Sequence, residues 1–234
     1  MQKYLKKIYQ GSELEFYNLL QKDLKNNSKR FIVTVNPETV MLAKNDFLMS
    51  EILLNKDVIL VPDGIGVVKA CRKLELPVTE RITGIDISQY LLKELNVQKK
   101  SIYLFGAKEE VVSKLVENIK NDYPNIVIKG YSNGYVKNRD LVFKKIIKLE
   151  PDVCLVALGV GEQEKIIYKY LNKFSKGIFI GVGGSFDVLS GYKKRAPKIF
   201  IKCNLEWLYR IIKEPARLKR FWKNNVKFVW HIKK

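Results

Sequence analysis

Short apolar runs alternate along this chain with longer segments in which apolar residues recur every three or four positions. The short runs have the length of strands, and the longer segments have the spacing of amphipathic helices. We expect strands near residues 31–35, 58–61, 101–105, 126–131, 153–158 and 177–182. A long helical stretch is expected from Pro37 to about Leu54. The clearest helix is expected over 109–122, where five apolar side chains share one stripe: Val111, Val112, Leu115, Val116 and Ile119.

Strands that are apolar throughout indicate a parallel sheet covered by helices on both faces. Because crossovers between parallel strands are right-handed, the alternation predicts a Rossmann-like, doubly wound, mostly parallel α/β sheet. The pattern changes near Phe200, after which Leu205, Leu208 and Ile212 have helical spacing. We therefore place a boundary near residue 195, with a Rossmann-like core over 1–195 and a basic helical appendage over 196–234.

Charge is concentrated at the end of the chain. Residues 193–234 contain fourteen Lys and Arg but two acids, so they carry +12 of the net charge of +19, and they hold all three tryptophans. A basic, amphipathic, Trp-bearing segment is typical of docking on an anionic surface, either a membrane or a nucleic acid. The basic residues alternate with Leu, Ile, Phe and Trp, which favours a membrane, and a nucleic-acid-binding protein is the less favoured alternative.

Composition narrows the class of protein. The chain has 234 residues, 47% hydrophobic and 29% charged, which is typical of a globular protein. No apolar run approaches the roughly 18 residues that span a bilayer, and no signal-peptide pattern is seen. Three scattered cysteines and the single His231 suggest neither disulfides nor a metal site. We expect a reduced, cytoplasmic protein that holds no metal and no cofactor.

Ligands of open α/β sheets bind beyond the carboxyl ends of the strands. The segment Gly181-Val-Gly-Gly-Ser185 follows an expected strand and precedes an expected helix. Such turns present backbone amides to a phosphate, so Gly183 and Gly184 are candidate phosphate contacts, although a simple tight turn explains them equally well. The segment lacks the Lys-Ser/Thr of a P-loop, which disfavours ATP hydrolysis.

Asp63 is the most interesting acid because it follows a strand that should be buried. A carboxylate in a partly dry cleft has a raised pKa, in the range that suits a general base. Pro62-Asp63-Gly64 is also a common turn sequence, and the sequence alone favours that simpler interpretation.

Four further polar residues stand at predicted strand ends or turns. Thr34 and Asn36 point to the same side of an extended segment and suit a polyhydroxylated ligand, or Asn36 simply caps the next helix. Arg81 can pair with a phosphate, but a solvated surface arginine is the favoured interpretation. Gln163 begins a predicted helix, where a polar first turn is common.

Taken together, eight segments in order resemble the WecG/TagA/CpsF family of bacterial glycosyltransferases. They are Thr34-Val-Asn36, Pro62–Val67, Glu80–Asp86, Tyr103–Ala107, Gly159–Lys165, Gly181–Gly191, Lys194–Pro197 and Leu205–Arg210 with Glu214-Pro215 and Arg217. Two local departures occur, at Gly161-Glu162 and Ile166-Ile167, and neither removes a candidate catalytic group.

The resemblance implies an inverting, metal-independent transfer from a UDP-sugar to polyprenyl-diphosphate-linked N-acetylglucosamine. In teichoic-acid members the sugar is N-acetylmannosamine and the linkage β1,4. The family pattern implies that Asp63 is the general base and that Thr34, Asn36, Arg81 and Gln163 contact sugar and acceptor. It also implies that the appendage completes the site through arginines, here Arg210, Arg217 and Arg220. With the Gly183 and Gly184 amides, these arginines would stabilise the UDP leaving group.

Several alternatives stay open. A family member with another donor, UDP-N-acetylmannosaminuronic acid or UDP-glucose, would serve capsule or antigen synthesis. A Rossmann-like scaffold without activity is the non-enzymatic alternative. The membrane-linked acceptor and the basic tail lead us to expect a protein held peripherally at the inner face of the bacterial membrane. Self-association stays open.

Overall fold

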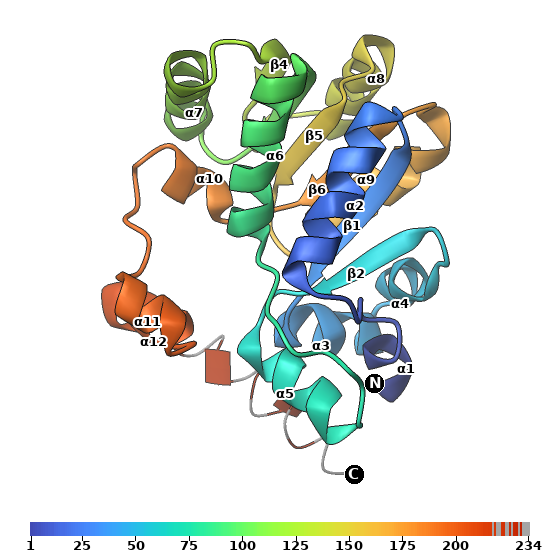
Figure 1. The fold of residues 1–234 in the computed structure, drawn as a ribbon, viewed down its shortest axis with the longest axis vertical. Helices are drawn as coiled ribbons and strands as arrows, with labels where there is room; N and C mark the ends of the chain where they lie inside the picture. The colour runs from blue at the N-terminus through green and yellow to red at the C-terminus, as the bar shows by residue number, and fades with distance from the viewer. Residues whose placement is uncertain (217, 219–220, 223–224, 226, 229, 231–234) are drawn as a thin grey trace.

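The computed structural model describes residues 1–216, 218, 221–222, 225, 227–228 and 230. Its centre is a parallel sheet with the strand order β2-β1-β6-β5-β3-β4 (Figure 1). The strands are β1 (Lys29–Val35), β2 (Val58–Pro62), β3 (Ser101–Gly106), β4 (Val127–Ser132), β5 (Val153–Ala157) and β6 (Gly177–Gly181). Each of the six strands lies within one or two residues of its predicted position, and the predicted Rossmann-like α/β class is confirmed.

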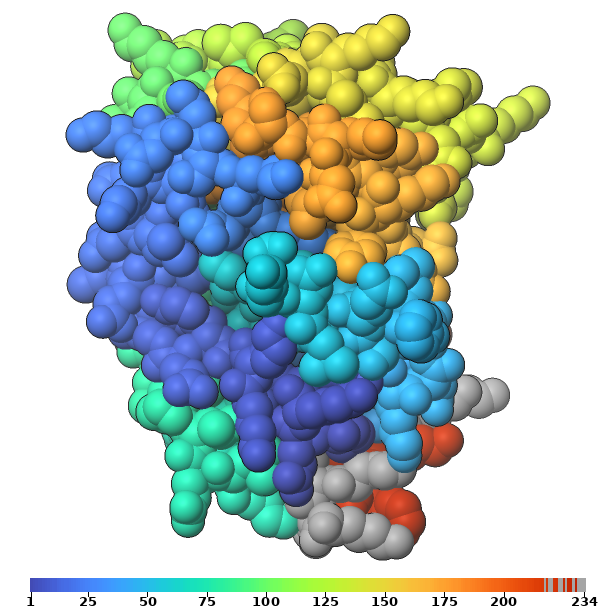
Figure 2. All heavy atoms as spheres, turned by 90° about the vertical axis from the view of Figure 1, so that its right-hand side faces the viewer, coloured from blue at the N-terminus to red at the C-terminus, as the bar shows by residue number. Residues whose placement is uncertain are grey.

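Helices cover both faces of the sheet and divide the core into two layers. One layer holds α2 (Glu13–Lys25), α6 (Gly84–Gln98), α7 (Glu109–Asp122) and α10 (Ser185–Leu189). The other holds α1 (Gln2–Leu5), α3 (Pro37–Asn45), α4 (Phe47–Leu54), α5 (Ile65–Lys73), α8 (Arg139–Leu149), α9 (Glu162–Tyr170) and the short 3₁₀ helix η1 (Leu171–Lys173). Figure 2 shows part of this second layer, where the N-terminal segment lies beside α4.

The strands alternate between these layers as their period of two requires. In β1, Phe31 and Val33 face the layer of α3 and α4, whereas Ile32 faces the layer of α2 and α6. All three side chains are buried, which is why the run is apolar throughout rather than alternating. Helix α7 occupies the predicted range 109–122, and its five predicted apolar residues are all buried.

The long helical stretch predicted after Pro37 is two helices. Asp46 has an extended backbone (φ −130°, ψ 114°), and its side chain accepts a hydrogen bond of 3.0 Å from the N–H of Met49. Asp46 therefore ends α3 and caps α4. The apolar spacing continues through the break, because both helices pack on the same layer of the core.

The segment after residue 195 forms α11 (Lys198–Lys202) and α12 (Glu206–Lys213), which Figure 1 shows to one side of the sheet. Trp207 stacks on Phe221 with ring centroids 4.6 Å apart. Phe228 is fully buried and belongs to the core layer that contains α5. The appendage thus returns to the core after α12 instead of projecting from it. Of the helices that the structure describes, none combines the length and apolarity needed to cross a bilayer.

Candidate active site

Asp63 lies directly after β2, at the carboxyl edge of the sheet. Its backbone N–H donates a hydrogen bond of 2.9 Å to the carbonyl of Val35 at the end of β1. The side chain is half-buried, and this burial raises the pKa of its carboxyl group to about 7. Positive Arg210 and Arg81 oppose the rise, and the negative charges of Glu206 and Asp86 add to it. The raised pKa agrees with the interpretation of Asp63 as a candidate base, which the sequence alone favoured less than a simple turn.

The end of β1 places Thr34 and Asn36 next to this turn. The Thr34 hydroxyl donates 3.0 Å to the carbonyl of Gly181 in β6, so it ties neighbouring strands together. The Asn36 side chain accepts 3.1 Å from the N–H of Thr39 and caps α3, as the simpler interpretation expected. A Cβ built on Gly64 would lie 3.6 Å from the Asn36 Cβ, so the two loops are in close contact.

Gln163 connects the turns that follow β5 and β6. Its Oε1 accepts a hydrogen bond of 3.1 Å from the N–H of Gly183, and its Nε2 donates 2.8 Å to Glu164. Glu164 also accepts 2.6 Å from the N–H of Gly161, and burial raises the pKa of its carboxyl group. Both side chains are buried, so the orientation of the Gln163 amide is fixed on both sides.

Gly183 and Gly184 form the turn between β6 and α10. Gly183 has φ +50°, in the left-handed region that favours glycine, and no described heavy atom lies within 4 Å of a Cβ built there. The Gly183 N–H donates to Gln163 in this structure. The turn is therefore open toward the site, but one of the two amides expected to face a phosphate is engaged by a side chain.

Arg81 stands in the loop between α5 and α6, and its side chain is 13% exposed. Its Nη2 lies 3.1 Å from Oε2 of Glu206, and the other Glu206 oxygen lies 2.7 Å from Nη2 of Arg210. The interpretation of Arg81 as a solvated surface residue, which the sequence favoured, is wrong because the side chain is largely buried and paired. The sequence did not reveal this pair, because the two residues lie 125 positions apart. Arg217 and Arg220 lie outside the described residues.

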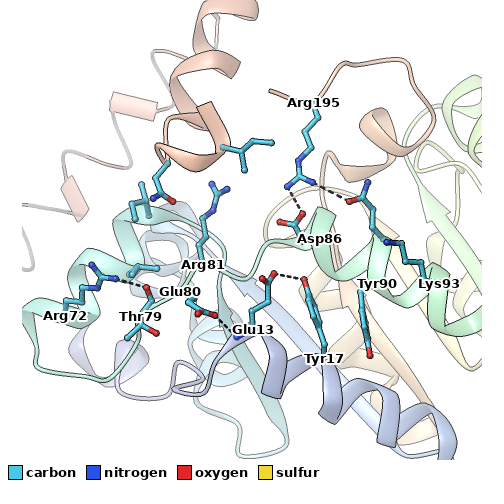
Figure 3. A pocket seen from close by; sticks show the side chains of 15 residues that line it. Glu13, Tyr17, Arg72, Thr79, Glu80, Arg81, Asp86, Tyr90, Lys93 and Arg195 are labelled. Carbon is cyan, nitrogen blue, oxygen red and sulfur yellow. Dashed lines mark hydrogen bonds and ion pairs between the residues drawn. The ribbon is translucent and has the colours of Figure 1, made fainter. Parts of the chain in front are cut away.

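A cavity of about 680 Å³ lies between α2, α5, α6 and α11, and its lining includes the first residue of α5, two positions after Asp63. Figure 3 shows Arg195 at one side of it, directed toward Asp86, and the rings of Tyr17 and Tyr90 lying parallel. Nη2 of Arg195 lies 2.6 Å from Oδ1 of Asp86. The buried Nε of Arg195 has no hydrogen-bond partner among the described residues. Arg81 and Asp86 line the cavity and also act electrostatically on Asp63. The cavity and the carboxyl group therefore form one region.

Sequence reasoning missed the roles of Glu206, Glu164 and Arg195 in this region. Each stands inside a segment that carried the resemblance. Glu206 and Arg195 pair with residues distant in the sequence, which only the fold brings near, whereas the partners of Glu164 are close in the sequence. The one signal for Glu206 was its charge, because it is one of two acids in the most basic stretch of the chain. Within the described part of the chain, no group of three or more His, Cys, Asp and Glu is arranged to hold a metal ion.

The parallel topology and a group of polar residues at the carboxyl ends of its strands define a Rossmann-like α/β enzyme. The family described as "Glycosyl transferase WecG/TagA/CpsF family" matches residues 6–234, and the chain belongs to this family of glycosyltransferases. The resemblance carried by the eight segments is confirmed.

The chain is similar to curated proteins that share the name N-acetylglucosaminyldiphosphoundecaprenol N-acetyl-beta-D-mannosaminyltransferase. The protein of Bacillus subtilis (strain 168) is 48% identical over 189 residues, which cover 81% of this chain and 73% of the relative. That of Bacillus spizizenii (strain ATCC 23059 / NRRL B-14472 / W23) is 43% identical over 84% of this chain and 76% of its own length. The protein of Staphylococcus aureus (strain MW2) is 40% identical over 81% of this chain and 74% of its own length.

Proposed function

We propose that this chain transfers N-acetylmannosamine from UDP-N-acetylmannosamine to polyprenyl-diphosphate-linked N-acetylglucosamine, with inversion and a β1,4 linkage, in wall teichoic acid synthesis. The names of the three relatives support the donor sugar and the acceptor. The observation that carries the chemistry is Asp63, a carboxyl group with a pKa of about 7 beside two arginines at the sheet edge.

In the proposed reaction the 4-hydroxyl oxygen of the acceptor sugar attacks the anomeric carbon of the donor. The bond from that carbon to the UDP oxygen breaks, and UDP departs with the electron pair. Asp63 accepts the hydroxyl proton. Attack from the face opposite the leaving group inverts the configuration. A base with a pKa of about 7 is partly ionised at neutral pH and still basic enough to accept this proton.

The negative charge that develops on UDP needs positive groups around it. Arg210 is the described candidate, and Arg217 and Arg220 follow it in the basic segment. Thr34 and Asn36, at the end of β1, and Gln163, in the first turn of α9, are proposed to position the donor sugar. The turn at Gly183 and Gly184 would lie near the diphosphate, as strand-to-helix turns do in sheets of this type.

The cavity beside Asp63 is the proposed acceptor site. Its lining carries four cations, Arg72, Arg81, Lys93 and Arg195, beside three acids, and the cations suit the diphosphate group of the acceptor. Residues 201 and 204, at the end of α11 and just beyond it, form part of its rim. A lipid chain leaving the cavity at that rim would run along the appendage.

The appendage is the proposed membrane contact and the second unit of the chain, from residue 196 onward. Ile199 is 68% exposed and Trp222 is 60% exposed, in a segment with eleven lysines and arginines and two acids. Exposed apolar side chains among cations suit the interface of an anionic bilayer. This arrangement supports a peripheral position at the inner membrane face, where the lipid-linked acceptor would be found.

The deciding experiment offers the purified chain three donors, UDP-N-acetylmannosamine, UDP-N-acetylmannosaminuronic acid and UDP-glucose, with a short-chain GlcNAc-diphosphate lipid. Mass spectrometry of the product should show one added N-acetylhexosamine, and NMR of the anomeric proton should show a β linkage. The reaction should proceed in EDTA. Preferred use of either other donor, or a strict requirement for added Mg²⁺ or Mn²⁺, would overturn the corresponding part of the proposal.

A further inference from the structure

Glu206 is a buried acid in the most basic segment of the chain. Residues 193–234 contain two acids, Glu206 and Glu214, which differ in how far they are buried. Glu214 is partly exposed and lies 3.0 Å from the solvated amine of Lys193. Glu206 is buried at the start of α12 and contacts two guanidinium groups. Burial of a charged group is costly unless it is fully paired, so this position needs an explanation.

Both carboxylate oxygens of Glu206 are used. One lies 3.1 Å from Nη2 of Arg81, in the loop between α5 and α6 of the core. The other lies 2.7 Å from Nη2 of Arg210, one turn further along α12. One carboxylate thus joins the appendage to the core and fixes two arginines from different parts of the chain.

The same three side chains act on Asp63. The charged groups that influence its carboxyl group are Arg81 from the α5–α6 loop, Asp86 from α6, and Glu206 and Arg210 from α12. Two of the four come from the appendage. The Asp63 region is therefore electrostatically complete only when α12 is docked.

We propose that Glu206 is a positioning residue, whose buried carboxylate holds the guanidinium groups of Arg81 and Arg210 beside Asp63 and so ties the docking of α12 to the assembly of the active site. This inference rests on the proposed role of Asp63 as the base. It adds that an acid, which touches neither substrate nor the reacting atoms, sets the field in which the base works. Without that acid, two cations would face Asp63 unbalanced.

The sign of each effect separates this role from a merely structural one. Glu206→Gln keeps the side-chain volume and an oxygen that can still accept a hydrogen bond from a guanidinium group, so the arginines stay in place while a negative charge near Asp63 is lost. The ionised form of Asp63 is then favoured and its pKa falls. Arg210→Gln removes a positive charge, so the pKa of Asp63 rises. A loosened α12 would instead admit water in both variants. Water relieves the burial that raises the pKa of Asp63, so both shifts would then be downward.

The experiment measures kcat/KM against pH for the full chain with UDP-N-acetylmannosamine and a short-chain GlcNAc-diphosphate acceptor. The acid limb of the profile should move by about one pH unit to lower pH in Glu206→Gln, and to higher pH in Arg210→Gln, the scale expected for loss of one neighbouring charge. Glu206→Asp should restore much of the wild-type limb. Glu214→Gln is the matched control, because it makes the same chemical change in the same segment and should leave the limb in place.

The outcomes are distinct. Shifts in opposite directions support the role of Glu206. Shifts in the same direction, or an unmoved limb in Glu206→Gln, would overturn it while transfer itself continues. If Glu206→Gln fails to fold, judged by circular dichroism and thermal unfolding, the pH profiles of Arg210→Gln and Glu206→Asp still decide. An upward shift of the limb in Arg210→Gln indicates a lost charge, and a downward shift indicates a loosened α12. Failure of the proposed function would look different, because the wild-type chain would then transfer no sugar.

Discussion

Gln163 accepts a hydrogen bond of 3.1 Å from the backbone N–H of Gly183, and this contact joins the turns that follow β5 and β6. The Nε2 of the same amide donates a hydrogen bond of 2.8 Å to the carboxylate of Glu164. The side chain is thus held in one orientation between a backbone donor and a buried acid. Any group that binds over these turns meets a surface whose shape depends on Gln163.

We expect Gln163→Ala to lower kcat/KM for the UDP-sugar roughly fivefold or more, because a buried hydrogen bond contributes about 1 kcal/mol and its loss leaves the Gly183 turn unsupported. Steady-state kinetics with the donor varied would measure this. Gln98→Ala is a suitable control, since Gln98 lies at the end of α6 and donates to Glu94 on the same helix. Equal kinetics for Gln163→Ala and wild type would mean that the Gln163 contact is structural alone.

Asp63→Asn should lower turnover by roughly 10²-fold or more, the scale of a lost general base, and should leave UDP binding near wild type. Asparagine keeps the size of the side chain but cannot accept the acceptor proton. Calorimetry with UDP and a transfer assay on the same preparation measure the two quantities. Near-normal turnover in this variant would remove Asp63 from the mechanism.

The raised pKa of Asp63 also predicts how stability varies with pH. In the unfolded chain this carboxyl ionises near its ordinary pKa of 3.8, whereas in the folded chain it stays protonated up to about pH 7. The folded state therefore loses stability relative to the unfolded state as pH rises from about 4 to 7. Asp63→Asn removes that loss, so its Tm should exceed the wild-type value at pH 8 by more than at pH 4.5. Differential scanning fluorimetry at both values tests the sign, and an equal difference at both would contradict the raised pKa.

The strands and the apolar face of α7 could be predicted because their side chains are buried in a regular period. The contacts of the site could not be predicted, because they join residues far apart in the sequence. The sequence alone favoured a surface position for Arg81, whereas the folded chain pairs it with Glu206. The sequence placed Gln163 at the start of a helix, but it did not show the hydrogen bond with Gly183. The break at Asp46 escaped prediction because the apolar spacing runs through it. The roles of Arg217 and Arg220 stay predictions.

Arg195 supplies a test of the proposed acceptor cavity. We expect Arg195→Gln to raise KM for a GlcNAc-diphosphate lipid several-fold and to leave KM for the UDP-sugar unchanged, because Arg195 lines the cavity and its buried Nε still finds no described partner. A GlcNAc glycoside without phosphate is the comparison substrate. Wild type should prefer the diphosphate acceptor, and the preference should shrink in the variant.

Arg30→Gln is the control for that experiment, since Arg30 pairs with Asp23 at the opposite end of β1 and does not line the cavity. It removes the same charge from the chain. An equal loss of preference in both variants would attribute the effect to overall charge. A raised KM for the donor in Arg195→Gln would instead assign Arg195 to the UDP site.

Membrane contact can be tested without removing the appendage. Deletion from Lys198 onward would also remove Phe228, a fully buried member of the core, and loss of a buried Phe costs about 3–5 kcal/mol of stability. Truncation would thus confuse unfolding with loss of docking. Substitution of exposed apolar side chains avoids this difficulty.

The pair Ile199→Ser and Trp222→Ser, made together, should lower binding to anionic liposomes at least tenfold, because each apolar side chain contributes about 1.5–3 kcal/mol when it leaves water. Activity on a water-soluble acceptor should stay near wild type, since neither residue lines the cavity. Phe47→Ser is the control, because Phe47 on α4 is 85% exposed and stands outside the appendage. Liposome flotation and soluble-acceptor kinetics measure the two quantities. If Phe47→Ser weakened binding as much as the pair, the membrane would contact α4 as well, and the appendage could not be the sole docking surface.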